Sequence, residues 1–144
     1  MGLDNGIRVH MKDKDAKIHC KSVFVEARSY IDCTYDIWTN ALLDEDEVAY
    51  WRKCWNIRSD IFDILKTKEN DVYYYDVSYD QLLQIIALLK SYNRFNWNKT
   101  DEYSIWEWKE IKPHLRRQIK TLKHVAAAMR EHPDAFTLQF YDSY

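Results

Sequence analysis

Glycine and proline are scarce in this chain, which has only two of each among its 144 residues. This scarcity excludes a collagen-like or low-complexity chain and argues against many tight turns. A glycine-rich phosphate-binding loop is also excluded, because two glycines cannot build one. Apolar side chains make up 47% of the sequence and aromatic ones 15%. A chain of this composition can bury enough surface to offset its ordering entropy, so it is not disordered.

An excess of charge of one sign is also missing. The sequence has 21 Lys and Arg against 23 Asp and Glu, a formal net charge of −2. A general nucleic-acid binder usually has a basic excess, so only a local patch could serve that role. The three cysteines, Cys20, Cys33 and Cys54, show no CxxC spacing. We therefore expect reduced thiols rather than a disulfide framework, and we expect no metal and no cofactor.

Long apolar runs are absent as well, since no stretch approaches the ~20 residues that span a bilayer. The first residues have no basic segment followed by an apolar run, as a signal peptide would have. Gly2 could accept a myristoyl group, but Gly6 stands where that modification requires Ser or Thr. The expectation is a cytoplasmic protein without a membrane partner.

Apolar–polar alternation predicts strands at 6–12 and 136–141, and one long strand or a hairpin at 22–33. The Val and Tyr content of 72–77 favours a further strand. Residues 34–43 show no clear pattern, and the polar stretch 93–103 is typical of a loop.

Helical spacing of apolar residues predicts a helix at about 46–66, which opens with the acids of 44–47. Acids at a helix start suit the positive end of the macrodipole, although a cation or basic-partner site is the alternative. Ser78 and Gln81 form a capping box for a helix at 79–92. Ser104 and Glu107 have the same spacing, and Pro113 then either kinks that helix or starts a new one at 113–132.

Together these elements predict one α+β domain over 1–144. Its sheet is small and mostly antiparallel, and three or four helices cover one face of that sheet.

The most polarised segment is 112–130, which has six basic residues and no acid. Arg116, Lys120 and Lys123 fall on one helical face, with Arg117 beside it. This face could hold a phosphate backbone or an acidic protein surface. A solvated face whose long side chains cover apolar stems is the alternative, as is docking on the acids of 44–47 in this or another copy.

Aromatic side chains are the second candidate for a binding surface, because six Trp and eleven Tyr exceed what one small core needs. Such side chains anchor protein interfaces and stack on bases. Trp97, between two asparagines in the predicted loop, is expected to be the best exposed contact. Trp106 and Trp108 are two residues apart on a predicted helix, so one of them should be partly exposed. Core packing is the alternative for all of them.

A third candidate is an anion pocket formed by Asp4, Arg52 and Arg58, where the predicted helix at 46–66 meets the chain start. Arg58 flanks the apolar face of that helix and could stack on an indole or pair with an acid such as Asp4. No catalytic residue is predicted. Cys54 falls on the apolar stripe, which favours a buried, inert thiol over a nucleophile.

Four passages together resemble a group of small uncharacterised bacterial and bacteriophage proteins. They are Met1 to Asp4, Tyr50 to Lys53 followed by Ile57, Tyr74 to Leu83, and Phe140 to Tyr144. Proteins of this group start with Met-Gly-Leu-Asp and contain a central Tyr-Trp-Arg-Lys segment. The resemblance implies a phage or mobile-element setting, a bacterial host cytoplasm and an accessory role. It also implies that the shared fold or site depends on Gly2, Asp4, Trp51, Arg52 and Lys53.

Three functions follow as expectations. The first is a non-enzymatic accessory protein of the anti-defence type that binds a host macromolecule, most simply a host protein. The second is a nucleic-acid or nucleotide binder that uses the 112–130 face. The third is a small enzyme with its site between the chain start and the helix at 46–66.

Overall fold

The fold was analysed in a computed structural model. It describes residues 4–11, 35–36, 41–42, 47–67, 74–97, 104, 106–134 and 136–143. In chain order the elements are β1 (Asp4–Met11), β2 (Tyr35–Asp36), β3 (Ala41–Leu42), β4 (Glu47–Arg52), α2 (Trp55–Leu65), β5 (Tyr74–Val77), α3 (Tyr79–Ser91), α4 (Trp108–Glu131) and β6 (Phe136–Ser143).

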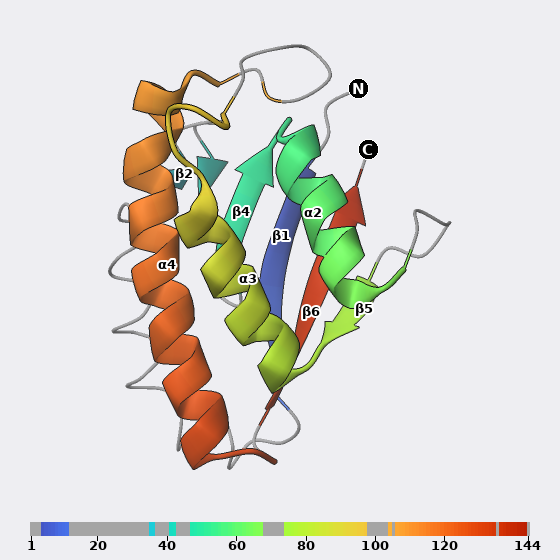
Figure 1. The fold of residues 1–144 in the computed structure, drawn as a ribbon. Helices are drawn as coiled ribbons and strands as arrows, with labels where there is room; N and C mark the ends of the chain where they lie inside the picture. Colours follow the sequence, from blue (N-terminus) through green and yellow to red (C-terminus); the bar gives the residue numbers. More distant parts are fainter. Residues whose placement is uncertain are drawn as a thin grey trace.

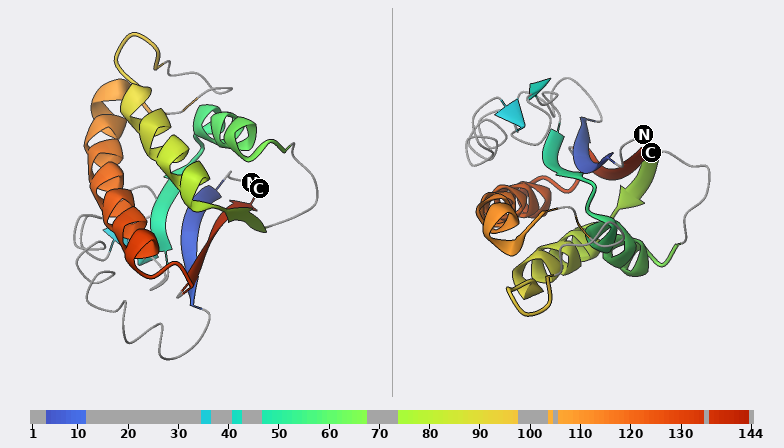
Figure 2. Two further views of the ribbon diagram at one scale, coloured as in Figure 1. Left: turned by 60° about the horizontal axis from the view of Figure 1, so that its bottom comes forward. Right: turned by 90° about the horizontal axis from the view of Figure 1, so that it is seen from above.

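A four-stranded antiparallel sheet, in the order β4-β1-β6-β5, is the centre of the fold. Helices α2, α3 and α4 all lie on one face of this sheet (Figures 1 and 2). Strands β1 and β6 pair along their whole length, from Asp4 opposite Ser143 to Met11 opposite Phe136. The predicted α+β fold, with an antiparallel sheet covered on one face by three helices, is confirmed.

Alternation places the apolar side chains of the central strands under the helices. In β6, Phe136, Leu138 and Phe140 are buried, while Thr137 and Gln139 between them are half-buried. The strand expected at 136–141 therefore exists and continues to Ser143. The expected strand at 72–77 is present in its described part as β5.

The capping box predicted for α3 is also present. The hydroxyl oxygen of Ser78 accepts from the Gln81 backbone N–H at 3.2 Å, and the Ser78 N–H donates to the Gln81 side chain at 2.9 Å. This box uses only residues three apart in the chain, which explains why the sequence alone located it.

The helix predicted at 46–66 is wrong in its first third. Residues Glu47–Arg52 form strand β4, paired with β1, and the helix begins only at Trp55. Lys53 separates the two elements with a left-handed backbone (φ 53°). A short apolar run is compatible with a strand and with a turn of a buried helix. Pairing with β1 therefore decides that Glu47–Arg52 is a strand. Glu47 consequently lies in a strand and does not begin a helix, whereas residues 44–46 are outside the described part.

The helix start predicted at Ser104 is also wrong. Helix α4 begins at Trp108, capped by Glu107 in a box with Glu110, whose side chain accepts from the Glu107 N–H at 3.1 Å. Ser104 instead forms an isolated bridge with Cys54. Pro113 is the sixth residue of one continuous helix and does not start a new one. The strand or hairpin expected at 22–33 lies outside the described residues, and β2 and β3 are the described parts of 34–43.

Helix α4 is fixed to the edge strand β4 by one buried side chain. Gln118 accepts from the Trp51 indole N–H at 2.7 Å and donates its amide to the Tyr50 carbonyl at 2.7 Å. Trp51 is completely buried. These bonds orient α4, because the face with Gln118 turns to the sheet and the opposite face turns to solvent.

Gly6 makes room for a side chain that crosses the sheet. Its strand partners are Tyr50 on one side and Tyr141 on the other, and the Tyr141 hydroxyl donates to the Glu47 carboxylate on β4. An added Cβ at Gly6 would lie 2.6 Å from the Ala49 carbonyl oxygen and 2.6 Å from the Tyr141 ring. Since one of these atoms belongs to the backbone, the site cannot relax by a rotamer change.

Replacing Gly6 with alanine is therefore expected to lower the free energy of unfolding by about 1–3 kcal/mol, the usual cost of overpacking a core. Urea denaturation measures this difference. His10→Ala, at an exposed position of the same strand, is the control and should change stability by less than about 0.5 kcal/mol. Equal stabilities for Gly6→Ala and the parent would contradict this prediction. They would show that β1 can move away from Ala49 and Tyr141 without a loss of stability.

Candidate binding site between α3 and α4

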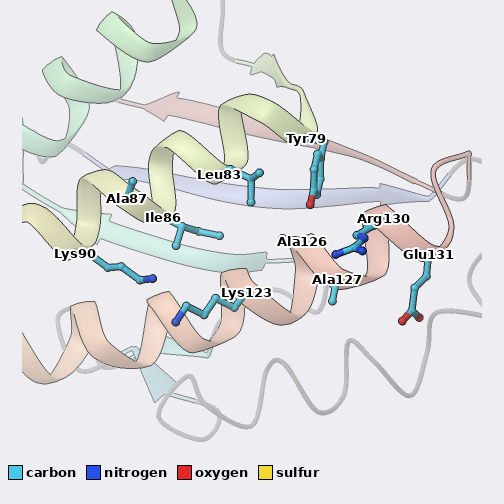
Figure 3. Close-up of a pocket in the computed structure, with 10 residues that line it drawn as sticks. All are labelled: Tyr79, Leu83, Ile86, Ala87, Lys90, Lys123, Ala126, Ala127, Arg130 and Glu131. Carbon is cyan, nitrogen blue, oxygen red and sulfur yellow. The ribbon is translucent and has the colours of Figure 1, made fainter.

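A surface groove runs between α3 and α4, with a volume of about 740 Å³ (Figure 3). The start of α3 and the end of α4 line the same end of the groove, so the two helices run antiparallel along it. The lining residues, five from each helix, are Tyr79, Leu83, Ile86, Ala87, Lys90, Lys123, Ala126, Ala127, Arg130 and Glu131. We call this feature the α3–α4 groove.

The floor of the groove is apolar. Ile86 and Ala126 are buried beneath it, while Leu83 keeps 42% of its surface exposed. Ala87 and Ala127 are exposed, and their small side chains leave the space between the helices open. A hollow with an exposed leucine at its base is a surface on which apolar side chains of another molecule could be buried.

Positive charges border the groove at both ends. The ammonium groups of Lys90 and Lys123 lie near one another across it, and Tyr79 points toward Arg130 at the other end (Figure 3). The close approach of Lys123 lowers the pKa of Lys90. Among the described residues, Glu131 is the single acid that lines the groove. Two ammonium groups held this close repel each other, and an anion placed between them would relieve that repulsion.

The predicted cationic face of α4 continues from this groove. Arg116, Lys120 and Lys123 are exposed, as is Arg130, and helical spacing aligns the four along α4. We call these four residues the cationic row. Lys123 and Arg130 belong to both features, while Arg117 is half-buried and lies beside the row. The structure thus joins part of the predicted basic face to Lys90 of α3, which the sequence did not single out.

The exposed contact predicted at Trp97 is wrong. Trp97 is only 5% exposed, and its indole N–H donates to the Trp106 carbonyl at 2.8 Å. Its ring meets Tyr92 edge-on at 5.3 Å between centroids and lies 6.2 Å from the ring of Trp108. Asn96, which precedes the indole, lies in a turn and does not indicate that the indole is exposed.

Trp106 and Trp108 are both half-buried and pack against the core. The Trp106 indole N–H donates to the Arg52 carbonyl at 2.7 Å, which ties the segment before α4 to the end of β4. Trp106 precedes α4, so the two tryptophans do not lie on one helix, and the argument that helical spacing turns them to different sides does not apply. Neither ring is available as a fully exposed contact.

Phe95 is an exposed aromatic residue that the sequence pattern did not reveal. It is 80% exposed, and the Arg94 guanidinium lies 4.6 Å from the centre of its ring. The Asn93 side chain accepts from the Phe95 N–H at 2.8 Å, and the Asn93 N–H donates to the Asn96 side chain at 2.7 Å. Asparagine pairs that bond the backbone in this way mark tight turns, and that signal could have placed Phe95 at the turn's tip.

The predicted anion pocket is filled by the protein's own carboxylate. Arg58 donates from Nε and Nη2 to the two oxygens of Asp142, at 2.7 and 2.8 Å. Its guanidinium also lies 4.8 Å from the Phe62 ring centre and 5.6 Å from that of Trp55, so the expected stacking on an indole is confirmed. The paired acid is Asp142 and not Asp4.

The other two members of the predicted pocket have structural contacts. The Asp4 carboxylate accepts from the Tyr50 hydroxyl at 2.5 Å, and Asp4 lies directly opposite Arg52 in the β1–β4 pairing. Arg52 is half-buried, and its carbonyl is the acceptor for Trp106. Asp4 and Arg52 are thus neighbours in the sheet, whereas Arg58 is engaged elsewhere.

Cys54 has the properties expected of an inert thiol. It is 1% exposed, and burial raises the pKa of its thiol to about 12. The reactive thiolate is therefore scarce at neutral pH. In the described ranges, no group of three or more His, Cys, Asp or Glu side chains is placed to hold a metal ion.

No helix among the described residues is both long and apolar enough to cross a bilayer. Compared with protein-family models, with curated proteins and with solved structures, the chain matches none of them.

Proposed function

We propose that this protein is a non-enzymatic interaction protein that binds an acidic host macromolecule, with a host protein as its partner. The observation that supports this proposal is the cationic row on α4, continued by Lys90 around the α3–α4 groove. Like charges gathered on one face attract an acidic surface and speed its association.

Two features of α4 favour binding over a purely solvating role for this face. The 112–130 segment has six basic residues and no acid, so the segment itself carries a high positive charge. The row also borders a concave apolar surface, which a merely solvated helix face does not need.

The setting proposed for this activity rests on the resemblance to small bacterial and phage proteins. On that basis the protein is an accessory factor of a phage or mobile element, of the anti-defence type, in the cytoplasm of a bacterial host. In the segment Tyr50 to Lys53, Trp51 is a core residue bonded to Gln118, so that part of the resemblance concerns the fold.

Nucleic-acid binding is the second candidate, because Arg116, Lys120 and Lys123 are exposed in one row that a phosphate backbone could follow. The small-enzyme alternative has weaker support. Its site was placed between the chain start and the helix that bears Arg58, and there Arg58 is bonded to Asp142.

The test is a charge reversal with a matched control. Arg116→Glu/Lys120→Glu removes two members of the cationic row. Arg94→Glu/Lys109→Glu makes the same change in net charge at two exposed positions outside it. Tagged proteins are used to capture partners from nuclease-treated bacterial lysate at low and high salt. We expect the first variant to retain about tenfold less partner, because each lost charge pair weakens association, and the control to capture as the parent does.

Equal capture by both variants would contradict the proposal. Material that is captured from untreated lysate but is missing from nuclease-treated lysate would favour the nucleic-acid candidate instead. In that case binding should also fall steeply with rising salt.

A further inference from the structure

We infer that the α3–α4 groove binds one acidic, amphipathic α-helix of the partner protein. This inference rests on the proposed function and specifies the chemistry of the partner.

The length of the groove fits a short helix. Along α3 it extends from Tyr79 to Lys90, a separation of eleven positions or about 16 Å at the rise of an α-helix. A partner helix of about three turns would cover this distance and pack on both α3 and α4. A helix docking its apolar face between two others is a common mode of peptide recognition.

The spacing of the cations sets where the partner's acids lie. Lys123, beside Lys90, and Arg130 are seven residues apart on α4, or about 10 Å. On a helix lying along α4, acids seven positions apart would therefore meet both cationic ends. Apolar residues three and four positions after the first acid would then face Leu83 and the two exposed alanines of the floor.

The apolar floor distinguishes this partner from a nucleic acid. A phosphate strand along the groove would place charged oxygens over Leu83, Ala87 and Ala127, which offer no hydrogen bonds, and the lost hydration would oppose binding. An amphipathic helix buries apolar side chains there and keeps its acids at the ends. We therefore assign the groove to a protein helix.

The experiment measures binding of a labelled peptide to the full chain by fluorescence anisotropy. The probe is a helix-forming peptide of about 14 residues, ~21 Å long when helical, with Glu at positions i and i+7 and Leu at i+3 and i+4. A scrambled peptide of the same composition and a single-stranded DNA are the comparison ligands. We expect the probe to bind about tenfold tighter than the scrambled peptide, because only the probe matches both floor and ends.

Leu83→Glu and Phe95→Glu are the matched protein variants, since both replace an exposed apolar side chain with an acid. Only Leu83 lines the groove, so only Leu83→Glu should weaken probe binding, by about tenfold or more, because it puts a charge where the partner is apolar. No detectable probe binding, equal binding of the scrambled peptide or equal affinity of the two variants would each overturn the inference. DNA binding that Leu83→Glu leaves unchanged, with no binding of the probe, would do the same.

The two proposals fail separately. If Arg116→Glu/Lys120→Glu loses the lysate partner while Leu83→Glu keeps both partner and probe affinity, the groove inference is wrong and the proposed function stands. If both variants capture the partner as the parent does, both proposals are wrong.

Discussion

Replacing Asp142 with alanine is expected to lower the free energy of unfolding by about 3–5 kcal/mol, as when one member of a buried ion pair is removed. Asp142 is 7% exposed and Arg58 8%. The carboxylate accepts two hydrogen bonds from Arg58 and a third from the Asn5 amide at 2.7 Å. Its loss leaves a positive charge and an amide donor buried between α2 and the two central strands.

The measurement is urea denaturation of the full chain, followed by far-UV circular dichroism. Glu131→Ala removes an exposed acid and should change stability by less than about 0.5 kcal/mol. The double variant Arg58→Met/Asp142→Leu removes both charges, so it should lose less stability than Asp142→Ala alone. If the double variant were the less stable of the two, the penalty would arise from packing and not from an unpaired charge.

The second large effect is expected at Trp97. Trp97→Ala should lower the free energy of unfolding by about 3–5 kcal/mol, as is typical for truncating a buried tryptophan. The substitution removes the ring that packs against Tyr92 and Trp108, and it leaves the Trp106 carbonyl without its indole donor. Trp97→Phe keeps most of the packing and loses the hydrogen bond, so its cost should be about 1–3 kcal/mol.

Phe95→Ala is the control, because Phe95 lies two residues away and is 80% exposed. It should change stability by less than about 0.5 kcal/mol. The sequence had predicted an exposed Trp97. Near-native stability of Trp97→Ala would therefore restore Trp97 as a surface contact and contradict the packing described above.

The contrast between these neighbours shows which aromatic positions the sequence could place. Phe136, Leu138 and Phe140 were placed correctly because strict alternation assigns them to one face of a strand. Trp97 directly follows a turn, where no period applies, and its burial depends on Tyr92, which caps the end of α3, and on Trp108, the first residue of α4. The asparagines near Trp97 in the sequence therefore led to a wrong prediction of its exposure.

The site was predicted in part. Local composition located the basic face of α4, since its charges follow one helical period within a single element. The groove needed α3 as well, and the meeting of Lys90 with Lys123 depends on how the two helices pack. Arg58 was correctly expected to stack on an indole, but its acid came from a strand 84 residues away.

The sequence by itself determined the α+β class, the capping box of α3, the central strand at the C-terminal end and the charge of α4. Each depends on residues a few positions apart, whose spacing reflects backbone geometry. Tertiary structure alone decided that Glu47–Arg52 pairs with β1 as a strand and that Asp142 neutralises Arg58. It also gave Lys53 and Lys66 left-handed backbone conformations, which glycine adopts more readily than other residues. These features follow from the pairing of distant strands and the docking of helices on them, and a local sequence pattern does not predict such contacts.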